Sequence, residues 1–228
     1  NLSAAINNTD VKALASVSVD DTQWCPDDVP RLWRYNLHYF DDLTAEDAAE
    51  RHELHLRRIQ SWIDNNPVLK GDGWEPYPQS LRIVNWVKFA LNGDSLSEAA
   101  VQSLALQAHV LSQDLEYHIL GNHLFANVKA LCFAGCFFTG DAAEGWLAKG
   151  LELLQRELPE QILADGGNFE LTPMYHAIML VDVLDLLNLL SAFNQRVDAA
   201  LLELLREYAA KMLHWLAVMS LGDDGISF

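Results

Sequence analysis

The sequence has few cysteines and few positive charges, and both shortages limit the classes of protein to which it can belong. Its 228 residues include three cysteines, Cys25, Cys132 and Cys136, an odd number without the regular spacing of a disulfide framework. The 15 lysines and arginines are outnumbered by 32 aspartates and glutamates, which gives a formal net charge of −17. Because nucleic-acid-binding proteins need a basic surface for the phosphates, we expect no nucleic-acid partner.

Long hydrophobic runs are also missing. No uncharged apolar stretch reaches about 18 residues, so we expect no membrane-spanning segment. The N-terminus lacks the basic region and apolar core of a signal peptide. Because the chain begins with Asn1 rather than Met, we expect a processed or trimmed chain, and a cleaved signal peptide is one explanation of the missing start. This predicts a periplasmic or secreted protein, with a cytoplasmic location as the alternative.

Strand-like alternation of apolar and polar residues is absent, whereas helical periodicity runs from Arg31 onward. We predict an all-α domain over residues 31–228, preceded by a polar N-terminal arm over residues 1–30 with a short helix at about 9–17. Periodicity leaves open whether the antiparallel helix pairs form a bundle or an α/α toroid. The predicted helices cover residues 46–65, 79–91, 97–117, the segment from a break at 118–121 through 138, and residues 142–158, 173–192 and 197–221.

The first of three polar clusters is residues 32–42, LWRYNLHYFDD. Asn36, His38 and Tyr39 are interleaved with aromatic rings, and no clear helical or strand pattern accounts for them. Such side chains form hydrogen bonds with hydroxyl groups, and flat rings stack on sugar faces. The cluster therefore favours a saccharide-binding role, and the alternative is a loop that covers one end of the domain.

The second cluster is residues 73–86, GWEPYPQSLRIVNW, in which Arg82 lies one turn inside a predicted helix. A helix N-terminus favours anions, and an arginine can hold a carboxylate with two parallel hydrogen bonds. The pattern predicts a site for a substrate carboxylate, and the alternative is an ordinary salt-bridged arginine.

The third cluster consists of two histidine-containing segments that each follow a glycine turn. Asn122 and His123 come directly after Gly121, at a break between helices. In DGGNFELTPMYH (165–176), Pro173 is expected at the first position of a helix, which puts Tyr175 and His176 in its first turn and Glu170 in the approach. Histidines beside helix starts are often structural, but the repeated arrangement indicates a functional site.

Four segments, LWRYNLHYFDDL, WEPYPQSLRIVNW, GNHLFANVKAL and DGGNFELTPMYH, occur in this order between residues 31 and 190. Together they resemble the heparinase II/III family of polysaccharide lyases, to which alginate lyases are related. The resemblance implies an incomplete α/α toroid of antiparallel helix pairs, followed by an antiparallel β-sandwich, with substrate held between the two. The sandwich is missing here, so we expect the chain to be inactive or weak by itself.

The resemblance also implies a reaction and a set of site residues. Lyases of this kind cleave the bond to C4 of a uronic acid in an acidic polysaccharide by β-elimination, with no metal or organic cofactor. Asn122 and His123 are expected to neutralise the uronate carboxylate. Tyr175 is expected to protonate the leaving oxygen, and it is also the candidate base. The residues expected to bind substrate or to orient these groups are Asn36, His38, Tyr39, Arg82, Glu170 and His176.

Two alternatives stay open. A glycoside hydrolase on the same toroid would need two carboxylates, for which Glu75 with Glu170 or Asp165 is the available pair. A non-catalytic saccharide-binding or polysaccharide-assembly protein would need no such pair. The net charge of −17 repels a polyanion at long range, which also leaves room for a less charged substrate.

Overall fold

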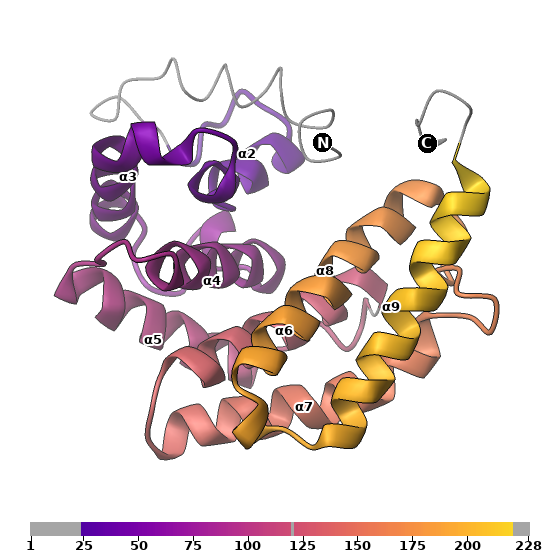
Figure 1. Cartoon of the computed structure of the whole chain (residues 1–228). Helices are drawn as coiled ribbons and strands as arrows, with labels where there is room; N and C mark the ends of the chain where they lie inside the picture. Colours follow the sequence, from indigo (N-terminus) through magenta and orange to yellow (C-terminus); the bar gives the residue numbers. More distant parts are fainter. Residues whose placement is uncertain (1–23, 120, 221–228) are drawn as a thin grey trace. The chain divides into compact units, whose positions relative to one another are not determined.

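The computed structural model of the protein describes residues 24–119 and 121–220 (Figure 1). The described residues are mainly helical and contain no β-strand, with one isolated antiparallel bridge between Ile162 and Asn168. This confirms the predicted all-α fold class. The short helix expected at about 9–17 and the turn expected after Leu221 lie outside the described residues. The predicted helical domain consists of two compact units, one ending at Asp114 and one beginning at Leu115.

Unit 1 is a set of helices joined by short 3-10 turns. Pro76 occupies the first turn of α4, and the Ser97 side chain accepts a hydrogen bond from the Ala100 N–H at the start of α5. The helix predicted from residue 97 begins at Glu98, whereas the helices predicted from residues 46 and 79 begin at His52 and Pro76. The elements of unit 1 are α2 (Arg31–Leu37), η2 (Asp41–Thr44), η3 (Ala48–Arg51), α3 (His52–Asn65), η4 (Asp72–Trp74), α4 (Pro76–Leu91) and α5 (Glu98–Gln113).

Aromatic rings fill the core of unit 1. Trp62 and Trp86 are fully buried and meet edge to face, with ring centroids 5.9 Å apart. Trp24, in the predicted N-terminal arm, stacks on Phe40 at 5.7 Å, and its indole N–H donates to the Ser61 hydroxyl at 3.3 Å. Trp24, at the described end of the arm, is therefore part of the core of unit 1, and much of the aromatic content serves this core.

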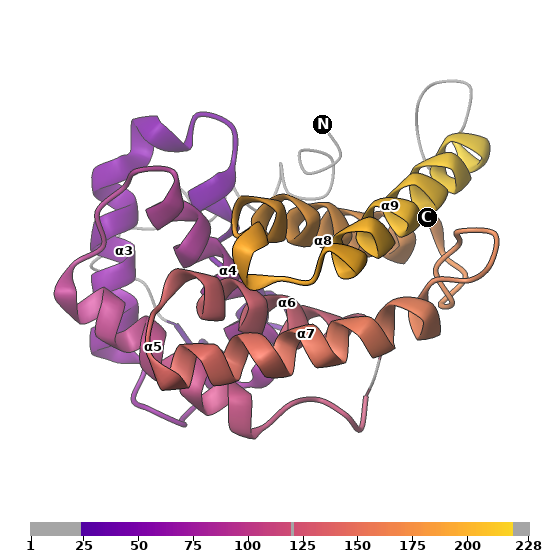
Figure 2. The same cartoon turned by 60° about the horizontal axis from the view of Figure 1, so that its bottom comes forward.

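Unit 2 contains two consecutive antiparallel helix pairs, and α6 also packs against α8 (Figures 1 and 2). Cys132 and Cys136, four residues apart in α6, are both buried as expected for one face of a core helix. The elements of unit 2 are α6 (Gly121–Phe137), α7 (Asp141–Gln161), α8 (Pro173–Ala192), η5 (Asn194–Arg196) and α9 (Ala199–Met219).

Helix α8 is long and apolar enough, by length and composition alone, to cross a membrane. Its contacts within unit 2 are those of a core helix. Asp182 and Asp185 hold the buried Lys129 ammonium of α6 at 2.7 and 2.5 Å. One face of α8 is buried, whereas Val181 and Leu184 are 51% and 38% exposed, so α8 is enclosed on one face only.

Candidate functional site

One end of unit 2 brings together the starts of α6 and α8, through the segment 162–172 that leads from α7 into α8. This segment folds back on itself, because Leu163 donates to the Gly167 carbonyl at 2.8 Å and Phe169 to the Gln161 carbonyl at 2.9 Å. Gly166 has φ 91°, and a Cβ at this position would lie 2.5 Å from the Lys211 carbonyl oxygen of α9. The glycine turn predicted from the sequence is thus required by close packing against α9.

Glu170 connects this segment to the start of α6. Its own N–H donates to the Asn168 side chain at 2.9 Å, which holds the backbone in place. Its carboxylate accepts a hydrogen bond from the Asn122 main-chain N–H at 3.2 Å. This N–H is in the first turn of α6, where backbone donors lack partners within the helix. The structure therefore joins the two histidine-containing segments that the sequence singled out.

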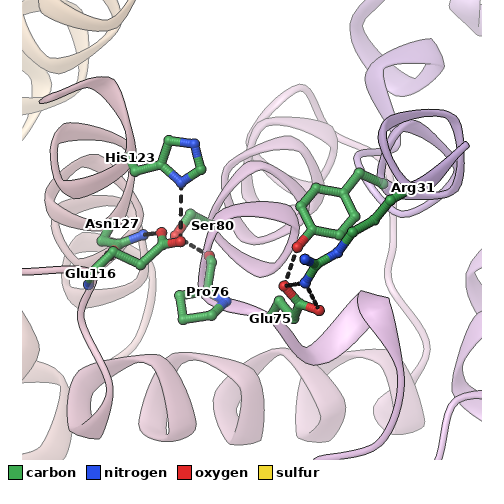
Figure 3. Close-up of polar contacts among 8 residues, drawn as sticks. Arg31, Glu75, Pro76, Ser80, Glu116, His123 and Asn127 are labelled. Carbon is green, nitrogen blue, oxygen red and sulfur yellow. Dashed lines mark hydrogen bonds and ion pairs between the residues drawn. The ribbon is translucent and has the colours of Figure 1, made fainter. Parts of the chain in front are cut away.

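His123 is paired with a carboxylate that sequence reasoning missed (Figure 3). Its ring nitrogen Nδ1 lies 3.0 Å from Glu116 Oε1, and the His123 side chain is 28% exposed whereas the Glu116 side chain is 7% exposed. The Asn127 side chain donates to Glu116 Oε2 at 3.1 Å. Asn127 lies four residues after His123 on the same face of α6, and this spacing is the sequence signal that could have predicted that the two side chains share a partner. Glu116 falls in the last turn of the helix predicted over residues 97–117, but in the structure this helix ends at Gln113 and Glu116 lies in the connection to α6.

Tyr175 and His176 lie in the first turn of α8, as predicted, and the Thr172 hydroxyl caps this turn by accepting from the Tyr175 N–H at 3.2 Å. The Tyr175 side chain is half-buried. His176 is fully buried, its Nε2 donates to the Met212 carbonyl at 3.0 Å, and its ring lies 4.3 Å from Trp215. Burial lowers the pKa of His176. In this structure His176 packs α8 against α9 and has no surface for a polysaccharide.

Arg82, expected to hold a substrate carboxylate, is fully buried inside unit 1. Its guanidinium donates to Gln107 Oε1 at 2.8 Å, to the Gly73 carbonyl at 2.7 Å and to the His38 carbonyl at 3.2 Å. It also lies 3.8 Å from the centroid of the Trp62 ring. Burial lowers the pKa of Arg82 well below its usual value. These neutral partners differ from both a substrate carboxylate and the ordinary salt bridge that was the alternative.

The three residues singled out in the first cluster occupy different environments. His38 is fully buried, its Nδ1 accepts a hydrogen bond from the Trp62 indole at 3.0 Å, and burial lowers its pKa to about 3. Tyr39 is 6% exposed, and its ring meets Tyr77 edge to face. Asn36 is exposed near the end of α2, a short helix that sequence reasoning missed. Of these three, Asn36 is the residue that a ligand can reach.

The carboxylates of the hydrolase alternative already have partners. Glu75 accepts from the Arg31 guanidinium at 2.5 Å and from the Tyr35 hydroxyl (Figure 3). Burial and the bond to Glu75 raise the pKa of Tyr35. Asp165 Oδ1 accepts from the Gly167 N–H at 3.0 Å, so this carboxylate stabilises the glycine turn. These contacts favour structural roles for both carboxylates.

The start of α6 and the first turn of α8 thus supply an amide, an imidazole paired with a carboxylate, and a phenol from Asn122, His123 and Tyr175. Such donors are suited to stabilising negative charge on a reacting carboxylate and to transferring a proton. Within residues 24–119 and 121–220, no group of three or more His, Cys, Asp or Glu side chains is arranged to hold a metal ion.

Comparisons with known proteins identify the family and the fold. The family model described as "Heparinase II/III N-terminus" matches residues 36–221. A heparin-sulfate lyase of Bacteroides stercoris is 30% identical over 145 residues, which is 50% of this chain and 21% of that protein. A heparin-sulfate lyase of Bacteroides thetaiotaomicron is 26% identical over 215 residues, which is 85% of this chain and 30% of that protein.

Among solved structures, one described as heparinase III superposes with a TM-score of 0.71 at 23% identity, and the match covers 91% of this chain and 34% of that one. This likeness shows a common fold. The chain spans at most about a third of the length of these relatives, with shares of 21%, 30% and 34%. Because the family model matches most of the chain, we conclude that the chain belongs to the heparinase II/III family, of which it carries the helical N-terminal domain.

Proposed function

We propose that this chain is the helical part of a polysaccharide lyase that cleaves an acidic, uronate-containing polysaccharide of the heparan sulfate class by β-elimination. The relatives' names, heparin-sulfate lyase, support this substrate class. The observation that carries the proposal is the hydrogen bond from the Asn122 N–H to Glu170. It ties the start of α6, with Asn122 and His123, to the segment that leads directly into Tyr175.

In this mechanism a base removes the proton from C5 of the uronate, and negative charge develops on the neighbouring carboxylate. The Asn122 amide and the His123 imidazolium donate hydrogen bonds to that carboxylate, a contribution worth roughly several kcal/mol in a site shielded from water. The electron pair of the C5–H bond forms the C4–C5 double bond as the C4–O4 bond breaks. Tyr175 gives its hydroxyl proton to O4 of the departing chain.

The binding roles divide by exposure. Asn36 is exposed and Glu170 is half-buried, so we propose that both contact substrate or orient the groups that do. His38, Tyr39, Arg82 and His176 are buried, and we propose that they support the site by holding their own units together. We also propose a periplasmic or secreted location, where a polymeric substrate would reach the enzyme without crossing a membrane. We further propose that activity depends on the region that accounts for the remaining length of the relatives.

The test is to express the protein from its complete reading frame and to incubate it with heparan sulfate. We expect unsaturated uronate ends, seen as new near-ultraviolet absorbance, together with shorter chains. The 228-residue chain by itself should give little or no product. If reducing ends appear without that absorbance, the enzyme is a hydrolase and the carboxylate alternative is favoured. If substrate binds without any cleavage, the saccharide-binding alternative is favoured.

A further inference from the structure

The carboxylate of Glu116 is buried and engaged at both oxygens. Glu116 is 6% exposed. Its Oε1 lies 3.0 Å from His123 Nδ1, and its Oε2 accepts a hydrogen bond from the Asn127 side-chain nitrogen at 3.1 Å. The Glu116 main-chain N–H donates in turn to Asn127 Oδ1 at 2.9 Å. Asn127 is fully buried, so this reciprocal pair holds Glu116 in one orientation.

The main-chain hydrogen bond determines which way the Asn127 amide faces. Because Oδ1 accepts from the Glu116 N–H, the amide nitrogen must be the atom that donates to Glu116 Oε2. An ionised carboxylate accepts hydrogen bonds only, so His123 Nδ1 must carry a hydrogen to bond with Oε1. In the neutral ring, the lone pair is therefore on Nε2.

We propose that Glu116, held by Asn127, is a positioning residue for His123: it fixes the ring orientation and the Nδ1–H tautomer and compensates the charge of the imidazolium. The effect of this positioning on catalysis rests on the proposed function, whereas the positioning itself does not. A buried carboxylate behind a histidine orients the ring and stabilises its charged form, as in the triads of hydrolases and the histidine ligands of metal sites. Here it supports the donor that faces the uronate.

The variant Glu116→Gln separates this role from simple packing. Glutamine keeps the shape of glutamate but has one acceptor oxygen and one donor nitrogen. Asn127 requires the oxygen, so the glutamine nitrogen faces His123 Nδ1, which must then accept. The substitution should therefore invert the tautomer and move the ring hydrogen to Nε2. A residue that merely fills space would leave the tautomer unchanged.

The tautomer is measured on the 228-residue chain by nitrogen NMR of labelled histidines at mildly alkaline pH, with the His123 signals assigned by their loss in His123→Gln. We expect Nδ1–H in the unmodified chain and Nε2–H in Glu116→Gln. The matched control is Asp94→Asn, which alters a second carboxylate–histidine pair, His52 Nδ1 to Asp94 Oδ1 at 2.8 Å. It should change the His52 signals only. An Nε2–H tautomer in the unmodified chain, or no change in Glu116→Gln, overturns the proposal.

The kinetic arm uses the protein expressed from its complete reading frame. Glu116→Gln should lower kcat by about tenfold to a hundredfold, the scale for removing a group that orients a functional histidine, with KM changed less than about threefold. Asp94→Asn should leave both unchanged. If Glu116→Gln inverts the tautomer but leaves kcat unchanged, Glu116 positions His123 without contributing to turnover, and this part of the proposal is overturned. If the unmodified protein forms no unsaturated product, the proposed function fails, and the NMR result still decides whether Glu116 positions His123.

Discussion

The main-chain N–H of Asn122 and the carboxylate of Glu170 meet at 3.2 Å although 48 residues separate them in the chain. This bond gives a helix-start donor a side-chain acceptor, and it holds the 162–172 segment against α6. Glu170→Ala should therefore lower the free energy of unfolding by about 1 kcal/mol, the usual cost of losing such an acceptor.

The comparison for this variant is Glu98→Ala. Glu98 also lies in the first turn of a helix, α5, but there the capping acceptor is Ser97. Urea unfolding should show a change of less than about 0.5 kcal/mol for Glu98→Ala. Equal losses in the two variants would mean that the Asn122–Glu170 bond adds nothing to stability.

Three glycine-to-alanine variants separate backbone strain from close packing. Gly166 has φ 91° and no room for a Cβ beside α9, so Gly166→Ala should cost about 2–4 kcal/mol. Gly93 has φ 100° but nothing within 4 Å, so Gly93→Ala should cost only the strain, about 1–2 kcal/mol. Gly145 lies in α7 with open space around it, and Gly145→Ala should stabilise by about 0.5–1 kcal/mol. Denaturant unfolding would contradict this account if the three did not follow this order.

Helix positions could be predicted from the sequence wherever local signals decide them. The helix predicted over 173–192 matches α8, because Thr172 and Pro173 mark its start. The helix predicted to end before Pro159 continues to Gln161. A proline in the last turn leaves the Gln155 carbonyl without its helical donor, and because Gln155 and Pro159 are exposed, water can satisfy that carbonyl.

The candidate site was predicted less completely, because burial depends on packing between distant segments. The sequence could show that Arg82 follows a helix start, but not that Gln107 and the Gly73 carbonyl would enclose its guanidinium. The pairing of Glu116 with His123 spans a helix break, and no periodic pattern extends across it. Local sequence patterns therefore indicated which segments form the candidate site, and tertiary contacts determined the role of each side chain in it.

Arg82→Met should destabilise unit 1 strongly rather than weaken substrate binding. The substitution keeps an apolar stem but leaves three buried acceptors without their donor, which should cost at least about 3 kcal/mol. The control is Arg206→Met in α9. The Arg206 side chain is 49% exposed and pairs with Glu203, so the change there should be within about 0.5 kcal/mol. A stable Arg82→Met protein with a raised KM would instead support the contact with a substrate carboxylate.

The stability of unit 1 should fall on acidification because of His38. Burial lowers its pKa to about 3 in the folded protein, from the ordinary value of 6.5. Below the unfolded pKa the unfolded chain binds a proton that the folded chain does not. The stability that His38 contributes is thus fully present above about pH 6.5 and is lost toward pH 3, by about 1.4 kcal/mol per pH unit.

Urea unfolding at several pH values between 7 and about 4 measures this slope. His38→Gln should reduce the slope of the unfolding free energy against pH by the contribution of about one proton. Glutamine still offers an acceptor to the Trp62 indole, but it does not titrate. His109→Gln, at an exposed position in α5, should leave the slope unchanged. If both variants keep the slope of the unmodified chain, the acid sensitivity arises elsewhere.

Tyr175→Phe, in the protein expressed from its complete reading frame, should lower turnover by at least about a hundredfold, the usual scale for losing a general acid or base. Phenylalanine keeps the ring, and the main-chain cap from the Tyr175 N–H to Thr172 is unaffected. A purely structural tyrosine would therefore lose little turnover. A catalytic one loses the proton that the departing oxygen needs, while substrate still binds, so KM should change little.

The matched control is Tyr208→Phe in α9, a half-buried tyrosine whose ring lies 5.5 Å from the Lys211 ammonium. Like Tyr175→Phe, this variant removes one tyrosine hydroxyl from unit 2, but it should leave turnover within about threefold of the unmodified enzyme. Asn122→Ala should differ from both, because losing a donor to the carboxylate weakens binding and the enolate-like transition state together. If Tyr175→Phe also stays within about threefold, Tyr175 is not the acid. The role then passes to His123, because the ring of His176 is enclosed between α8 and α9.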